Sequence, residues 1–211
     1  HVAEIRRDRS GSSIETVTAA TVLLGVPPFF RAFASLQTLE DRLGQFPEAL
    51  AGAGAVMQRA HRAAQFALGF AVHRMDHDAE VIHEAALLHD FTELLLWANA
   101  PSLALEIQRS KHRVPGMRST EAQRHALNIE LHDLQQALMH EWNLPDLLVR
   151  ISDDHETNDP QVRNVQLAIR IAKHSANGWD HPALQEDLAA SSTLLNLSES
   201  HTLQLLLELD S

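Results

Sequence analysis

The sequence has no cysteine and no tyrosine among its 211 residues. Without cysteine the chain can form no disulfide, use no thiol nucleophile and build no zinc site from thiolates. It also lacks an apolar run long enough to span a bilayer, and no signal-peptide pattern opens it. We therefore expect a cytoplasmic protein that does not enter a membrane. The first residue is His1 rather than Met, which indicates a trimmed chain or a piece of a longer protein.

Positive charge is scarce, because 17 Lys and Arg residues face 28 Asp and Glu residues and the net charge is −11. This excess of negative charge argues against a large contact with a phosphate backbone, so we expect no nucleic-acid partner. A small anionic ligand held by a local cluster remains compatible with it. Residues 109–118, RSKHRVPGMR, are the local exception because they concentrate basic side chains. Such a segment is typical of a solvated loop, and the alternative is a contact site for an acidic partner.

What the sequence does have is a hydrophobic fraction of 45%, enough for a folded core, and a helical periodicity along most of its length. Alternating β-branched runs are absent, whereas Ala and Leu are abundant. The sequence predicts a single all-α domain over residues 1–211, folded as a multi-helix bundle. The first expected helix runs from a cap at Ser12 and Ser13 to Gly25. Further helices are expected over 47–74, over 79–98 and through the segment SLALEIQRS. The remaining helices are expected from Thr120 to Pro145, from Pro160 to Ser175, and twice in the tail.

The stretch AALLHDFTELLLW, residues 85–97, places His89 and Asp90 inside an almost wholly apolar helix. On a helical wheel His89 and Glu93 share the remaining narrow face, and Asp90 lies about 100° from His89. Buried polar groups need partners, and a buried carboxylate needs a cation, a metal or several hydrogen-bond donors. The residues alone leave two interpretations open, which are an internal hydrogen-bonding network and a metal or ligand site.

Other histidines and the end of the chain also allow more than one interpretation. The 14 histidines make coincidental pairs common, so we interpret His73 with His77 and His132 with His140 as solvated or hydrogen-bonded side chains, with metal pairs as the alternative. The leucine-rich end, HTLQLLLEL, is expected to pack on the bundle, and a homodimer seam is the alternative.

The segment EAALLHDFTELLL, residues 84–96, resembles the signature of the HD superfamily of metal-dependent phosphohydrolases, and in particular its HDOD branch. The surrounding order is similar as well. IETVTAATVLLGV and MQRAHRAAQFA precede the signature, and LHDLQQALMHEWNLPDLLVRISDDHE and NVQLAIRIAKHSANGWD follow it, so that the resemblance covers residues 12–180. It implies an all-α bundle of HD/HDOD type, in which the N-terminal helices usual in a full HDOD domain have no counterpart.

For catalytic members of the superfamily, the resemblance implies a metal held by an early His, the His-Asp pair and a late Asp. Transferred to this chain, the early His is His61 and the pair is His89 and Asp90, with His155 as a further ligand. Imidazole and carboxylate together suit Mn, Fe or Zn. Such a metal would polarise a phosphoryl oxygen and lower the pKa of a bound water.

The resemblance fails at several positions of that site. The Gly-Lys of the family falls on Thr92 and Glu93, the central His on Leu131, and its following Gly on Gln135. The His-His falls on DH at 154–155, and the late Asp falls in LAIRIAKH, which has no carboxylate. The catalytic apparatus is therefore incomplete, and we predict no catalytic residue and no required cofactor.

We accordingly expect a bacterial, non-catalytic regulatory domain that binds a protein partner or a small ligand within a signalling pathway. The partner would be a separate protein or another domain of that pathway, and a homodimer stays open. The alternative is a divergent metal-dependent phosphohydrolase that acts on a nucleotide or phosphoester. Its divalent Mn, Fe or Zn ion would be bound by His61, His89, Asp90 and His155.

Overall fold

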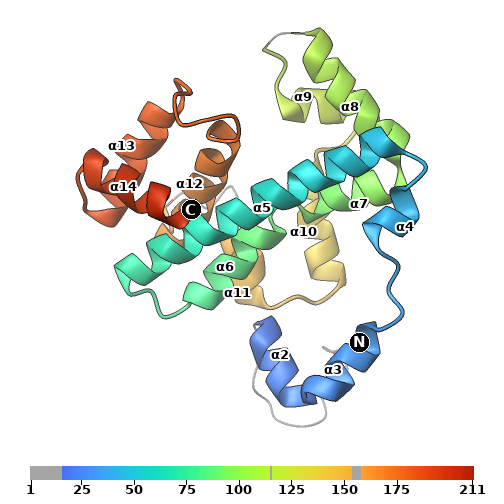
Figure 1. Ribbon diagram of the computed structural model, residues 1–211, viewed down its shortest axis with the longest axis horizontal. Coiled ribbons are helices and arrows are strands. Elements are labelled where there is room, and N and C mark those ends of the chain that lie inside the picture. Colours follow the sequence, from blue (N-terminus) through green and yellow to red (C-terminus); the bar gives the residue numbers. More distant parts are fainter. Residues whose placement is uncertain (1–15, 115, 154–157) are drawn as a thin grey trace. The chain divides into compact units, whose positions relative to one another are not determined.

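The computed structural model describes residues 16–114, 116–153 and 158–211, and these residues form helices and no strand (Figure 1). The all-α prediction is confirmed. The described residues fall into two compact units: unit 1 draws on residues 16–24, 58–89, 144–153 and 158–211, and unit 2 consists of residues 25–57, 90–114 and 116–143. The expectation of one domain over 1–211 stays a prediction. None of the helices in the described part combines the length and apolarity needed to cross a membrane.

Unit 1 contains most of the large side chains that are fully buried. Its helices are α2 (Val17–Leu24), the C-terminal part of α5 (Pro47–Arg74), α6 (Ala79–Leu88), α11 (Asp146–Ile151), α12 (Pro160–His174), α13 (Leu184–Leu195) and α14 (Glu199–Leu209). α12 contacts α6, α11 and α13, and α14 packs against α13. The core side chains include Phe66, Phe70, Ile82, Ile151, Val162, Ile171, Leu184 and Leu206. The leucine-rich end of the chain therefore packs within its own unit, as the sequence predicts.

Polar side chains tie the helices of unit 1 together. The guanidinium of Arg62 donates to both carboxylate oxygens of Asp210, at 2.7 and 2.8 Å, and to the hydroxyl of Ser175 at 2.9 Å. The fork geometry of Arg matches a carboxylate, so this contact fixes the end of α14 on α5. On the buried side, the Asn164 amide donates to the Ala67 carbonyl at 3.1 Å and links α12 to α5.

Unit 2 is built around a tryptophan. Its helices are α3 (Val26–Phe33), α4 (Leu39–Leu43), the N-terminal part of α5, α7 (Phe91–Asn99), α8 (Pro101–Arg113), α9 (Ser119–Leu127) and α10 (Leu131–Glu141). Trp97 of α7 packs with Leu43, Ala53 and Val56 in the unit's apolar cluster. A Cβ atom added at Gly52 would lie only 2.5 Å from the Trp97 ring, so the ring fits there because Gly52 has no side chain.

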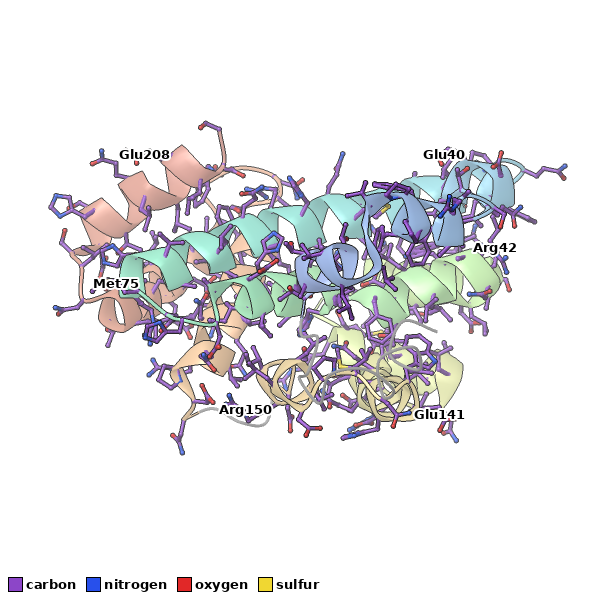
Figure 2. The ribbon with its side chains drawn as sticks, turned by 90° about the horizontal axis from the view of Figure 1, so that it is seen from below. Glu40, Arg42, Met75, Glu141, Arg150 and Glu208 are labelled. Atoms are coloured by element: carbon purple, nitrogen blue, oxygen red, sulfur yellow. The ribbon has the colours of Figure 1, made fainter. Side chains whose placement is uncertain are left out.

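The N-terminus of α4 carries a capping box, in which the hydroxyl of Thr38 accepts from the backbone N–H of Asp41 and the Asp41 carboxylate accepts in return. Arg42, on the same helix, donates to the Ala98 carbonyl and to the Asn99 side chain, both at 2.6 Å (Figure 2). These two contacts hold α4 at the C-terminal end of α7, and the first of them satisfies a backbone carbonyl that the helix end leaves open.

Several helix boundaries agree with the sequence and others correct it. α5 runs over Pro47–Arg74 as predicted, and α2 ends before Gly25, whose φ of 80° suits glycine. The predicted helix from Thr120 to Pro145 is wrong, because Asn128 takes a left-handed conformation, φ 59°, and ends α9 before α10 begins. Asn tolerates this conformation better than most residues. The predicted cap at Ser12 and Ser13 lies outside the described residues.

The basic segment RSKHRVPGMR is also more helical than the sequence predicts. Lys111, His112 and Arg113 form the last turn of α8, and α9 starts at Ser119, so that the loop is shorter than expected. Cationic side chains in the last turn of a helix interact favourably with its negative end, which explains why α8 continues through them.

Candidate functional site

The His89–Asp90 pair lies at a turn between two helices rather than in the middle of one. α6 ends at Leu88, α7 begins at Phe91, and the predicted continuous helix over 79–98 is therefore wrong. The backbone of Asp90 leaves the helical region, with φ −100° and ψ 20°, and its carbonyl then accepts from the N–H groups of Glu93 and Leu94. Both side chains of the pair are half-buried. The pair therefore occupies a junction between helices.

His61, the predicted early ligand, is an exposed residue of α5 in unit 1. Its Nε2 lies 3.5 Å from the amide nitrogen of Gln65, one helical turn further on. A second histidine, His83 of α6, lies close enough that His61 affects its ionisation. Burial lowers the pKa of His83 below its ordinary value of 6.5, His61 lowers it further, and Glu80 acts in the opposite direction. His83 is therefore a neutral imidazole at pH 7, the form that accepts hydrogen bonds and binds metals.

Glu84 follows His83 on α6, and its carboxylate also has a shifted pKa. Burial raises the pKa of Glu84, the hydrogen bond from the Val17 N–H partly counteracts this, and Glu80 raises it again. The hydrogen bond measures 2.7 Å and joins α6 to the first turn of α2. A carboxylate is a favourable acceptor for the unpaired N–H groups at a helix start. Glu84 therefore has a structural partner within unit 1.

The sequence reasoning missed both His83 and Glu84. They border the buried positions of α6, which are Val81, Ile82, Ala85 and Ala86. The helical period places His83 and Glu84 at the edge of this face, but it does not predict which side chains pack over that edge. The signal that was available is the position of a histidine and a glutamate side by side on a helix whose only other polar residue is Glu80.

In unit 2, positions that the resemblance assigns to the catalytic motif are part of the packed interior. Thr92, which replaces the motif's Gly, is 2% exposed, and its hydroxyl donates to the Leu131 carbonyl at 3.2 Å. Leu131, which replaces the central His, is 7% exposed and its N–H donates to the side chain of Gln123 at 3.0 Å. Gln135, which replaces the following Gly, is also buried. These side chains link α7 to the start of α10 and present no metal ligand at the motif positions.

The described donors do not form a metal centre by themselves. Residues 16–114, 116–153 and 158–211 contain no group of three or more His, Asp or Glu side chains that could hold a metal ion. Of the four predicted ligands, His61 and His89 belong to unit 1 and Asp90 to unit 2, and His155 lies outside the described residues. A bound metal would supply Lewis acidity and an activated water. The ligand set His61, His89, Asp90 and His155 stays a prediction.

Two solved structures are similar to this chain in fold. One is the response regulator MmoQ from Methylococcus capsulatus strain Bath, with a TM-score of 0.66 and 19% identity, where the match covers 96% of this chain and 79% of that one. The other is a candidate phosphohydrolase from Shewanella amazonensis SB2B, with a TM-score of 0.60 and 18% identity, covering 98% of this chain and 88% of that one. At these identities the two structures support the fold alone.

A search of curated proteins gives no match to this chain. The sequence profile of the HDOD domain matches residues 9–158, which is more than half of the chain. That range includes the His89–Asp90 turn and the buried Thr92 and Leu131 positions, and its all-α architecture agrees with the two similar structures. The chain belongs to the HDOD domain family, a branch of the HD superfamily.

Proposed function

We propose that this chain is a non-catalytic HDOD regulatory domain that binds a protein partner or a small ligand in a signalling pathway. The observation that carries the proposal is the buried contact between Thr92 and Leu131. Leu131 offers no side-chain ligand to a metal, and its carbonyl already accepts the Thr92 hydroxyl. A water-activating centre needs several donors in good geometry, and two of the motif positions here serve packing instead.

The role in signalling has weaker support, which comes from one of the similar structures. That structure is named a response regulator, although its 19% identity limits the likeness to the fold.

The proposal is tested by phosphodiesterase assays on the purified chain with bis-p-nitrophenyl phosphate and added Mn²⁺, Fe²⁺ or Zn²⁺. We expect wild type to show no turnover above that of Asp90→Ala, because the site lacks its full set of ligands. Asp133→Ala is the matched control, since Asp133 is an exposed aspartate of α10 in the same unit as Asp90.

Turnover that Asp90→Ala abolishes and Asp133→Ala retains would contradict the proposal. It would support the divergent phosphohydrolase, with a divalent metal bound by His61, His89, Asp90 and His155. Metal content measured on the same preparations adds a second criterion, because stoichiometric Mn, Fe or Zn that is lost in His89→Ala would accompany such turnover.

A further inference from the structure

The hairpin of α8 and α9 in unit 2 concentrates positive charge in an acidic chain (Figure 1). Five of the chain's 17 Lys and Arg residues lie within residues 109–124, together with a single acidic residue, Glu121. We call these five basic residues and the two histidines near them the α8–α9 basic surface, and all seven side chains are exposed. It consists of Arg109, Lys111, His112, Arg113, Arg118, Arg124 and His125.

The α8–α9 basic surface contains two depressions. One depression lies on α8 and is lined by Ser102, Glu106, Arg109 and Arg113. A second lies on α9 and is lined by Arg118, Thr120, Glu121, Arg124 and His125. Each depression thus places two guanidinium groups and one carboxylate beside a hydroxyl group that can donate a further hydrogen bond.

Three of these basic side chains have no acidic partner in the part of the chain that the structure describes. They are Arg113, Arg118 and His125. Arg109 pairs with Glu48 at 3.0 Å, but the two side chains are 58% and 69% exposed. Arg124 pairs with Glu130 while it remains 71% exposed. The pair of Arg109 and Glu48, exposed on both sides, contributes little to stability, so a carboxylate from another molecule can replace Glu48. Glu130 is only 19% exposed, and its pair with Arg124 is not of this kind.

Helix stability explains some of these cations and not others. Lys111, His112 and Arg113 stand in the last turn of α8, where positive charge complements the helix dipole. Arg118 stands at the opposite kind of end, as the N-cap of α9, where the dipole is positive and its side chain makes no cap hydrogen bond. A positive charge there opposes the dipole. Helix stability therefore does not explain Arg118.

From these observations we infer that the α8–α9 basic surface binds an acidic, carboxylate-rich segment of a protein partner. The inference rests on the proposed regulatory function and names the chemistry of its partner. Guanidinium groups bind carboxylates through paired hydrogen bonds, and electrostatic screening over about 8 Å at physiological salt lets a short segment respond to this surface alone. A long nucleic acid would also meet the rest of a chain whose net charge is −11, which repels it.

The test measures binding of a fluorescein-labelled oligoglutamate peptide to the full chain by fluorescence anisotropy. We expect the Arg113→Gln/Arg118→Gln double variant to bind about tenfold more weakly than wild type, because it loses two guanidinium groups with no internal partner. Arg31→Gln is the matched control, since Arg31 is an exposed arginine of α3 in the same unit, and it should bind as wild type does. Added salt should weaken binding to wild type more than binding to the double variant. Circular dichroism melting establishes that the variants are folded.

Three outcomes would overturn the inference. The first is an absence of peptide binding, or equal binding by wild type and the double variant. The second is tighter binding of a single-stranded DNA oligonucleotide than of the peptide. The third is a concentration-dependent dimer, seen by sedimentation, that the double variant loses, because a second copy of the chain would then occupy the surface. Phosphodiesterase activity that depends on Asp90 would instead contradict the proposed function and leave peptide binding by the basic surface unchanged.

Discussion

In unit 1 a carboxylate with no exposed surface, Asp187, contacts His174 at 2.6 Å and Arg170 at 2.7 Å. In unit 2 the ion pair of Arg109 with Glu48 lies at the surface, with more than half of each side chain exposed. The first carboxylate has lost its hydration and depends on its two partners, whereas the second pair stays hydrated whether or not it forms. Asp187 therefore holds α13 to α12, whereas the pair of Arg109 and Glu48 stays accessible to solvent.

The two units also differ in the kind of side chain that packs against a glycine of α5. In unit 2 the backbone at Gly52 approaches the rigid indole of Trp97, where an added Cβ would lie 2.5 Å away. In unit 1 an added Cβ at Gly69 would lie 2.3 Å from a terminal methyl of Leu209, which is the flexible end of a side chain. The indole is a large rigid ring, whereas the Leu209 methyl ends a smaller side chain, so the position of Gly52 adjusts less readily to an added atom.

The largest effect is expected from Asp187→Ala. Removing this carboxylate leaves His174 without a partner from α13 and leaves Arg170 with only the exposed Glu186, so we expect a loss of about 3 kcal/mol in the free energy of unfolding. Urea denaturation followed by circular dichroism measures it. The control is Glu186→Ala, which removes the other carboxylate that contacts Arg170 but one that is 79% exposed. It should cost less than about 1 kcal/mol. Equal losses in the two variants would show that burial of Asp187 is not what makes it important.

A smaller effect is expected from Gly52→Ala in unit 2. The added methyl group must displace the Trp97 ring, and overpacking of this kind costs about 2 kcal/mol. Gly54→Ala, two residues further along α5, places its methyl in open space. It should leave the protein as stable or raise its stability by up to about 1 kcal/mol, because Ala is the better helix former. Thermal melting of both variants, with tryptophan fluorescence as the probe, separates the two cases. A stable Gly52→Ala variant would contradict the close approach to Trp97.

The smallest effect is expected from His83 of unit 1, through the change of the free energy of unfolding with pH. The pKa of His83 is lowered in the folded state, so acidification below its ordinary value of 6.5 protonates the unfolded chain first. The contribution of His83 is therefore present above pH 6.5 and is lost as the pH falls through its lowered folded value. His83→Gln should flatten the profile of stability between pH 8 and pH 5, measured by denaturation at each pH.

His77→Gln is the control for that experiment, because His77 is an exposed histidine of the same unit. It should keep the wild-type slope. Glu84 acts with the opposite sign at lower pH, since its raised pKa gives a contribution that is present below 4.5 and lost as the pH rises through the folded value. A His83→Gln profile as steep as that of wild type would mean that burial of His83 does not affect stability.

Much of the helical architecture follows from local sequence signals. The bounds of α5 and the end of α2 at Gly25 were predictable because Pro47, the apolar period and the glycine all act within a few residues. The breaks at Asp90 and Asn128 were not, because apolar periodicity continues through both of them. Whether such a residue leaves the helical conformation depends on what the two flanking helices pack against.

The candidate site also combines features that the sequence reveals with features that only the folded structure shows. The HD signature and its departures at Thr92 and Leu131 can be found in the sequence, since they are questions of residue type and order. The hydrogen bond from the Thr92 hydroxyl to the Leu131 carbonyl cannot, because it joins residues 39 positions apart. His83 was missed for the same reason, as its lowered pKa depends on burial and on His61 of another helix.

The sequence by itself determined that this chain is helical, that it belongs with HDOD domains and that its catalytic motif is incomplete, because periodicity and motif order are local properties. Only the tertiary structure decided which charged residues are internal partners and which face solvent. Asp187 lies beside Glu186 in the first turn of α13, and Arg118 is the N-cap of α9. The local sequence at either position does not say whether the charged side chain is buried. The difference arises because α12 covers Asp187 with Arg170 and His174, whereas no carboxylate within the described residues covers Arg118.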